Sequence, residues 1–576
     1  MTRRSSSPLR AAPTGRPPGG ARPSVHARPA ASDAASTRPA GSVPWAVLLV
    51  AAVVVGTLLR AWQLDWQVLI DDEWHAVHKL LRAPVADIVS RLGYADYSIP
   101  LTLYYRFLLD HGGLSERVMH APLLAAGVAL LVVLPWLARS WTALPQRATW
   151  VALLAISPLL VYHSKIARPY ALTSLLTAVA IVAFREGWRT GRASYWIAYV
   201  PGTFVAGYLN PVTLPFTLAP FLFYGLPALR DVLGGRVPLA ASRLPLLLGI
   251  GALVALPLAA ALLPPMINDW AQFGAKAGRD DVTPESAWRT WLMLAGTGRA
   301  AAGIAVLAFA TVGVSALRRR DPDLARYLGM VLALGAVTVA ATRAKWIMHP
   351  LVLARYLLPA LPFLLLFVAE GMLRAAAHVR RAGAQIAIVA ALVAALALAG
   401  PLPAVGYVPN QFWGHLRFQF DYDRRHNPYV QRIPQAPIPA FYRELAKLPP
   451  RSVTLVEMPW RLESNFNPHP WYQQVHRQWV KIGLVTPVCG EREFGEYPET
   501  PGMRMRWLVH LTALLRGETF GADYLVVHVV PWKTPPDEDV EWPDMSTCLP
   551  LIEARFGAPV HREDGLLVYA TKPASR

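Results

Sequence analysis

The sequence has few charged residues and few cysteines for its length. Asp, Glu, Lys and Arg make up 16% of its 576 residues, whereas 54% of the residues are hydrophobic. A chain with so little charge is too apolar for a single soluble globular protein. Its two cysteines, Cys489 and Cys548, allow one disulfide, and their spacing alone leaves open whether they pair. The composition therefore indicates a membrane protein.

Long apolar runs recur from Trp45 to about residue 400. A helix needs about 20 residues to cross the hydrocarbon core of a bilayer, which is about 30 Å thick. By this criterion the sequence predicts about eleven transmembrane helices. They are expected near 45–64, 118–137, 148–163, 170–185, 194–210, 211–227, 244–264, 301–317, 327–345, 351–371 and 383–401.

The basic residues predict which side of the membrane each connection faces. The formal net charge is +19, yet Lys and Arg form no patch interleaved with exposed aromatic residues, which argues against nucleic-acid binding. Arg outnumbers acidic residues in every second connection, and this excess is typical of the cytoplasmic side. The remaining connections are acidic or mixed and are expected outside. The basic connections are 138–147, 185–192, 227–243, 318–326 and 374–381.

Three regions are expected along the chain. Residues 1–44 are rich in Arg, Pro, Ala, Ser and Gly, which predicts a disordered cytoplasmic tail. Residues 45–401 form the predicted transmembrane domain, with a long external loop at 65–117. Its amphipathic stretch 76–92 predicts a helix on the membrane surface. Residues 402–576 predict a small external α/β domain, with strands near 453–457, 522–530 and 565–570 and a helix near 441–448.

The first candidate site is an acidic run that follows the first predicted span. Asp71, Asp72 and Glu73 are consecutive, and acids this close to a bilayer usually have a function. The alternative is a solvated loop, or a helix N-terminus where carboxylates offset the helix dipole. A metal site formed by Glu73, His75 and His78 is a weaker hypothesis, because no further ligand cluster is evident.

Two basic segments on the predicted external side complete the candidate site. Lys165 and Arg168 lie between two spans, in a connection that is positive where its neighbours are not. Arg355 lies at the edge of an apolar run, where an arginine usually has a partner. Snorkelling of these side chains to the interface is the alternative. Guanidinium groups hold phosphate oxygens in a bidentate fork, so a carboxylate beside these bases suits a reaction on a lipid phosphate.

These motifs resemble those of the GT-C membrane glycosyltransferases. The resemblance spans about residues 45–400 and is closest to bacterial relatives of protein O-mannosyltransferases and of the lipid A aminoarabinose transferase. It rests on the order of several short segments: Asp72-Glu73-x-His75, Pro100–Tyr105, Gly113–Arg117, Ala167–Leu172 and Ala354–Pro359.

The resemblance implies an inverting hexosyl or pentosyl transferase that takes its sugar from a polyprenyl-phosphate donor. The acceptor would be a membrane lipid, a glycan or a protein, and the reaction would occur on the external face of a bacterial inner membrane. Asp72 would be the catalytic residue, with Glu73 beside it and Asp71 as a competitor. The donor phosphate would be bound by Lys165, Arg168, Tyr170, Arg355 and Tyr356.

No metal cofactor is expected at this site, although a divalent ion stays an alternative. Relatives often carry an acid shortly before the arginine of the second motif, whereas this sequence has Ile166 there. The nearby bases would also repel a cation. The alternative is that Asp71, Asp72 and Glu73 together hold Mg²⁺ or Mn²⁺.

Two other functions compete with sugar transfer. A transporter or flippase for a lipid-linked or anionic substrate would also place charges near the membrane, but it would favour mid-span charges and internal repeats, and no clear repeat is found. A non-catalytic assembly protein would use residues 402–576 as a binding module, with 467–472 and His476 as a recognition surface.

Overall fold

The computed structural model describes most of the chain from Ser42 onward. The described residues are 42–66, 68–69, 73–92, 98–403, 436–460, 468–489, 502–530 and 542–572. The predicted disordered tail at 1–44 lies almost entirely outside these residues. Asp71 and Asp72 lie outside them too.

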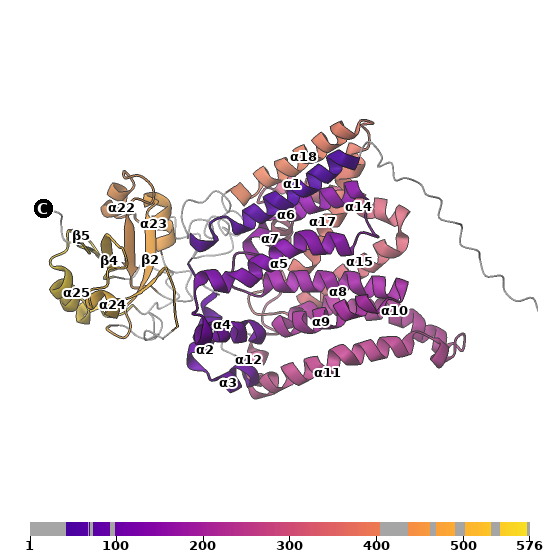
Figure 1. Ribbon diagram of the computed structural model, residues 1–576, viewed down its shortest axis with the longest axis horizontal. Helices are drawn as coiled ribbons and strands as arrows, with labels where there is room; N and C mark the ends of the chain where they lie inside the picture. The colour runs from indigo at the N-terminus through magenta and orange to yellow at the C-terminus, as the bar shows by residue number, and fades with distance from the viewer. Residues whose placement is uncertain are drawn as a thin grey trace, which may run out of the picture. The chain divides into compact units, whose positions relative to one another are not determined.

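The polytopic helical architecture predicted from the sequence is confirmed. Among the described residues, nine helices are long and apolar enough to cross a membrane. Figure 1 shows several of them side by side, among them α1, α5 and α8. Seven of the nine are single helices: α1 (Ser42–Ala61), α5 (Glu116–Leu137), α8 (Tyr170–Thr190), α11 (Leu244–Asn268), α14 (Ala300–Arg320), α15 (Pro322–Ala341) and α18 (Ala382–Ala399). The other two join a 3-10 turn to a helix: Pro211–Leu233 includes α10 (Leu214–Leu233), and Leu358–Ala376 includes α17 (Leu361–Ala376).

Shorter helices occupy the other two expected spans. The span near 194–210 is α9 (Ala193–Leu209), and the span near 148–163 is divided into α6 (Leu144–Ile156) and α7 (Pro158–His163). Pro158 has no N–H to donate to the carbonyl of Leu154, so the helix breaks there. The guanidinium of Arg60, buried in α1, donates to the carbonyls of Leu154 and Ala155 at 2.9 and 3.1 Å. A membrane arginine thus satisfies the carbonyls that the break leaves open.

Glycines allow α14 and α17 to pack closely. A Cβ atom at Gly313 would lie 1.8 Å from the carbonyl oxygen of Phe367, and one at Gly371 would lie 1.9 Å from that of Phe309. Both contacts are with backbone, which cannot move aside. Close approach at small residues is a common way for membrane helices to associate.

The long first connection is folded into short helices. The amphipathic stretch 76–92 forms α2 (Trp74–Arg82) and α3 (Val85–Ser90), separated at Pro84. Its apolar residues Val77, Leu80 and Ile88 are buried in a core shared with α4 (Ile99–His111) and the C-terminal domain. Much of the apolar face of this stretch therefore packs against protein, while Val85 and Val89 of α3 are exposed, and its position on the membrane surface stays a prediction.

The remaining short elements connect the long helices. They are η1 (Leu64–Trp66), η3 (Pro211–Thr213), η4 (Leu239–Ala241), α12 (Trp270–Ala275), α13 (Pro284–Ala295), α16 (Pro350–Tyr356) and η5 (Leu358–Ala360).

The C-terminal region contains one six-stranded sheet, and the expected strands and helix are confirmed. The strand order is β3-β2-β1-β4-β6-β5, in which β3, β2, β1 and β4 are parallel and β6 and β5 are antiparallel. The strands are β1 (Thr454–Met458), β2 (Trp479–Leu484), β3 (Leu508–His510), β4 (Tyr524–His528), β5 (His561–Glu563) and β6 (Leu566–Ala570). The helical elements are α22 (Ala440–Leu445), α23 (His469–His476), α24 (Leu511–Leu515), η8 (Met545–Thr547) and α25 (Leu549–Phe556).

A disulfide crosslinks the sheet domain internally, and a buried carboxylate joins the domain to α5. Cys489 and Cys548 are disulfide-bonded, with their Cα atoms 5.6 Å apart. The carboxylate of Glu116, at the start of α5, accepts hydrogen bonds from the backbone N–H groups of Arg506 and Trp507, both at 3.0 Å. The domain is therefore tied to the start of α5, where the connection from α4 arrives.

Candidate active site

Glu73 joins the acidic segment to the basic segment between α7 and α8. Its buried carboxylate oxygen Oε1 accepts a hydrogen bond from the backbone N–H of Ala167 at 2.6 Å. The same oxygen lies 2.7 Å from Nε2 of His120, on the buried face of α5. The hydroxyl of Tyr105 donates to the carbonyl of Ala167 at 3.2 Å. Segments 94 residues apart in sequence are thus fixed against each other.

Lys165 is a buried cation in the connection between α7 and α8. Its side chain is 2% exposed, and its Nζ has no hydrogen-bond partner among the described residues. Burial lowers the pKa of Lys165 to about 8, because desolvation disfavours the charged ammonium. A buried ammonium with no partner in the described part of the chain attracts an anion strongly. This group is therefore suited to an anionic ligand.

Arg355, from the second basic segment, lies beside the connection between α7 and α8. Its guanidinium carbon lies 5.6 Å from the ring centre of Tyr170, the first residue of α8, and 5.6 Å from that of Tyr356. The ring of Tyr170 also contacts His163, with the centroids 5.0 Å apart. Arg168 is half-buried in the same connection. The second and third predicted motifs therefore meet at the N-terminal end of α8.

An apolar cavity of about 890 Å³ lies between α1 and α5 at the end that leads to the acidic segment. Trp62 and Leu64 line it on one side, and Ala121, Leu124 and Val128 line it on the other. These positions of α5 recur at helical spacing, so one face of α5 lines the cavity while the other carries His120.

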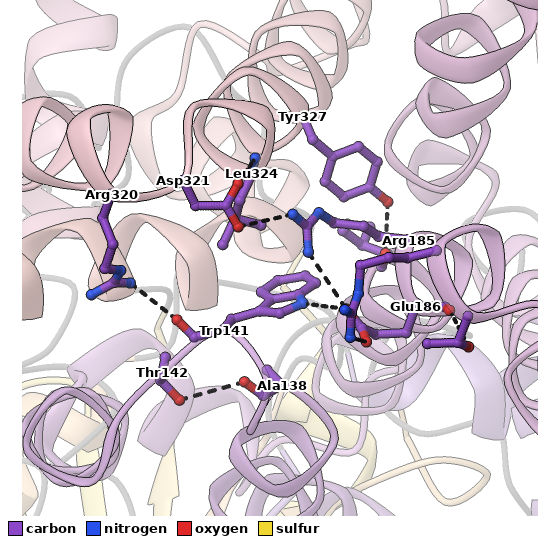
Figure 2. Close-up of polar contacts among 12 residues, drawn as sticks. Ala138, Trp141, Thr142, Arg185, Glu186, Arg320, Asp321, Leu324 and Tyr327 are labelled. Atoms are coloured by element: carbon purple, nitrogen blue, oxygen red, sulfur yellow. Dashed lines mark hydrogen bonds and ion pairs between the residues drawn. The ribbon is translucent and has the colours of Figure 1, made fainter. Parts of the chain in front are cut away.

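A second polar cluster lies at the opposite end of α8, which is 21 residues or about 30 Å long. Figure 2 shows Glu186 accepting a hydrogen bond from Trp141 at 2.8 Å, and Arg185 paired with Asp321 at 3.0 Å. Arg320 donates to the carbonyl of Trp141 at 3.0 Å. These residues come from three connections that the charge pattern places on one side. The basic connections thus meet at one end, and the candidate site lies at the other.

The sequence did not reveal several residues of the site. His120 and Tyr105 lie in apolar helices, and nothing local links either one to Glu73 or Ala167. Arg60 was likewise not predicted, although a lone arginine in an apolar span was a usable signal. The metal hypothesis for Glu73, His75 and His78 gains no support, since these three form no ligand group among the described residues.

No protein-family model and no curated protein matches this sequence. Solved structures do match. The chain is similar to two kinds of membrane transferase. ArnT from Cupriavidus metallidurans matches in its apo state with 15% identity and a TM-score of 0.43, over 92% of this chain and 98% of ArnT. Its structure bound to undecaprenyl phosphate matches over the same shares, with 14% identity and a TM-score of 0.44.

The apo oligosaccharyltransferase of Archaeoglobus fulgidus matches with 13% identity and a TM-score of 0.41, over 76% of this chain and 64% of that enzyme. At these TM-scores the likeness is distant, so the chemistry of this chain rests on its own residues.

Proposed function

We propose that this protein transfers a sugar from a polyprenyl-phosphate donor to an acceptor at the external face of the membrane. The observation that carries the proposal is the meeting of three separate segments at the N-terminal end of α8, in a connection that holds a buried cation with no hydrogen-bond partner among the described residues. Glu73 fixes the acidic segment to Ala167, Lys165 lies two residues away in the chain, and Arg355 contacts Tyr170. An acid beside several cations at the end of a membrane helix suits cleavage of a sugar–phosphate bond.

The reaction proceeds as a single displacement in this proposal. Asp72 accepts the proton of the acceptor hydroxyl as its oxygen attacks the anomeric carbon. The bond between that carbon and the phosphate oxygen breaks, polyprenyl phosphate leaves, and the configuration inverts. Lys165, Arg168 and Arg355 stabilise the charge that develops on the leaving phosphate. Tyr170 and Tyr356 help to position the Arg355 guanidinium, whose carbon lies 5.6 Å from each ring centre.

Glu73 has a positioning role in this scheme. Its Oε1 already accepts from Ala167 and His120, so Glu73 anchors this segment and is not itself the free base. The cavity between α1 and α5 would take the apolar polyprenyl chain, because its lining is mostly apolar and includes Ala61 to Leu64, which lead from the end of α1 toward the acidic segment.

Two observations support an external site. The basic connections gather at the far end of α8, as the positive-inside pattern requires of the cytoplasmic side. The Cys489–Cys548 disulfide belongs to the domain tied to the near end, and disulfides persist in oxidising compartments such as the periplasm. A membrane-impermeant thiol reagent should label a cysteine introduced near Lys447 in intact cells, but not one introduced at Arg319.

The transfer reaction is tested with purified protein and a panel of polyprenyl-phosphate sugars. The readout is the release of free polyprenyl phosphate. A positioned general base contributes about 10²–10⁴-fold to the rate, so Asp72→Asn should lower turnover at least about 100-fold while the protein remains folded. Asp87→Asn changes an exposed acid in the same loop and should keep wild-type turnover. Near-normal turnover in Asp72→Asn would remove the assigned base.

A further inference from the structure

Three ionisable side chains meet in the core of the C-terminal domain, away from the proposed active site. Glu457 belongs to β1, His469 is the first residue of α23, and His528 is the last residue of β4. One potential ligand atom from each lies within 4.8 Å of the others. All three residues are buried. Parallel strands β1 and β4 are neighbours, so both side chains arise near the carboxyl ends of adjacent strands, a common place for ligand sites.

The carboxylate of Glu457 has no hydrogen bond within the described part of the chain. Its oxygen Oε2 lies 3.6 Å from Nε2 of His469 and 3.8 Å from Nε2 of His528, which is too long for hydrogen bonds. Neither ring nitrogen of His469 has a hydrogen-bond partner there. Leaving such groups buried and unsatisfied costs several kcal/mol in general, so we expect a further partner for these side chains.

A neutral carboxylic acid is the simplest alternative, because burial raises the pKa of Glu457. Protonation would not satisfy the cluster, however. A neutral carboxyl group would still need a partner for its O–H within about 3 Å. The histidine nitrogens are at 3.6 and 3.8 Å, and the Tyr442 hydroxyl, which also approaches Glu457, can serve only one of its oxygens and leaves both ring nitrogens of His469 unsatisfied. A cation between the three groups would satisfy all of them at once.

The separations match those between ligands of one metal ion. Zinc binds histidine nitrogen and carboxylate oxygen at about 2.0–2.2 Å, so two ligands at a tetrahedral angle are about 3.4 Å apart. The observed 3.6 and 3.8 Å from the carboxylate to the two histidines would need shifts of only a few tenths of an ångström. The two histidine nitrogens lie within 4.8 Å of each other and could need a larger shift. Two nitrogens and one carboxylate suit zinc better than Mg²⁺ or Ca²⁺, which prefer oxygen ligands throughout.

The surrounding hydrogen bonds fix which histidines can be ligands. The backbone N–H of Gln478 donates to Nδ1 of His476 at 3.0 Å, so the hydrogen of a neutral His476 ring is on Nε2. That N–H points toward Oε1 of Glu457 at 3.8 Å, which suits an outer partner that orients the carboxylate. The Tyr442 hydroxyl lies 3.2 Å from Nε2 of His528, the same nitrogen that faces Glu457. Metal binding by His528 would therefore replace this hydrogen bond.

Aromatic rings enclose the cluster. Trp460 lies 5.0 Å from the His469 ring, and Tyr472 stacks on His528 at 6.1 Å with nearly parallel planes. The enclosure keeps bulk water away and holds the rings in place. We propose that Glu457, His469 and His528 bind one Zn²⁺ ion that fastens β1, β4 and α23 together. This site is independent of the sugar-transfer proposal.

The test uses the full-length protein in detergent with every affinity tag removed. After equilibration with Zn²⁺ and desalting, mass spectrometry of the metal content should find about one zinc per chain. Glu457→Gln and His469→Gln should lose it. His561→Gln changes a half-buried histidine of β5 outside the cluster and should retain it. Zinc-free wild-type protein, or full zinc content in the two cluster variants, would overturn the proposal.

A second measurement covers the case in which these variants fail to fold. His469→Cys keeps a metal ligand but replaces nitrogen with sulfur. Loaded with Co²⁺, this variant should show a sulfur-to-cobalt charge-transfer band that the Co²⁺ wild-type protein lacks. Bound Co²⁺ without that band would place the metal elsewhere and contradict the assignment. In His476→Gln the zinc affinity should fall about 10–100-fold, as expected for an outer partner.

Discussion

Replacing Lys165 with methionine should make the protein more stable and its donor binding weaker. The pKa of the buried ammonium is about 8, against 10.5 for a free lysine side chain. Each pKa unit corresponds to about 1.4 kcal/mol, so holding this charge without a partner costs about 3 kcal/mol. Methionine fills a similar volume without the charge and should recover much of that cost.

The sign of the pH dependence follows from the lowered pKa. Below pH 8 the lysine is charged in both the folded and the unfolded chain, so the folded protein bears the full free-energy cost of the buried charge. Between about pH 8 and 10.5 the unfolded chain binds the extra proton, so the stability of the wild-type protein rises with pH. The stability gain of Lys165→Met should therefore be largest near pH 7 and should vanish above about pH 10.5.

Donor binding should change in the opposite direction. A hydrogen bond to a charged group contributes about 1.5–3 kcal/mol, so Lys165→Met should weaken polyprenyl-phosphate binding about 10- to 100-fold. Thermal unfolding with and without polyprenyl phosphate measures both effects. Lys345→Met removes an exposed lysine and should change neither. A Lys165→Met variant that binds the lipid phosphate as tightly as the wild-type protein would refute the reasoning.

Three further changes test the other parts of the site. Arg355→Lys keeps the charge but loses the two parallel hydrogen bonds of the planar guanidinium, so kcat/KM should fall at least tenfold. Full activity would mean that only the positive charge of Arg355 matters. Glu73→Ala leaves the buried Ala167 N–H and His120 without their acceptor, so the free energy of unfolding should fall by about 2–3 kcal/mol, and wild-type stability would contradict that role. Transfer assayed directly in excess chelator should keep its rate, since the site's own cations neutralise the phosphate; loss that Mg²⁺ or Mn²⁺ restores would make Asp71 and Glu73 ligands.

The membrane architecture could be predicted because hydropathy acts over single segments. Every expected span is occupied by helix, since about 20 apolar residues have no other stable arrangement in a bilayer. The breaks at Pro84 and Pro158 were not predicted, although proline marks both. The packing of much of the apolar face of α2 and α3 against protein was not predicted, because sequence periodicity identifies a buried face but not what covers it.

The candidate site was predictable in its charges but not in its contacts. The unusual positive charge of the connection after α7 identified Lys165 and Arg168, and the position of Arg355 in an apolar run identified the third segment. Their meeting depends on tertiary packing, such as the bond from Ala167 to Glu73 across 94 residues. The cluster of Glu457, His469 and His528 comes from three separate elements, so no local spacing in the sequence indicated it.

The most direct test of the account is a cryo-electron microscopy structure of the protein with polyprenyl phosphate bound. We predict phosphate density within hydrogen-bonding distance of Lys165 Nζ, beside the Arg355 guanidinium, with the lipid chain in the cavity between α1 and α5. Phosphate density at the other end of α8, near Arg185 and Arg189, or no ordered phosphate beside Lys165, would contradict the proposed site.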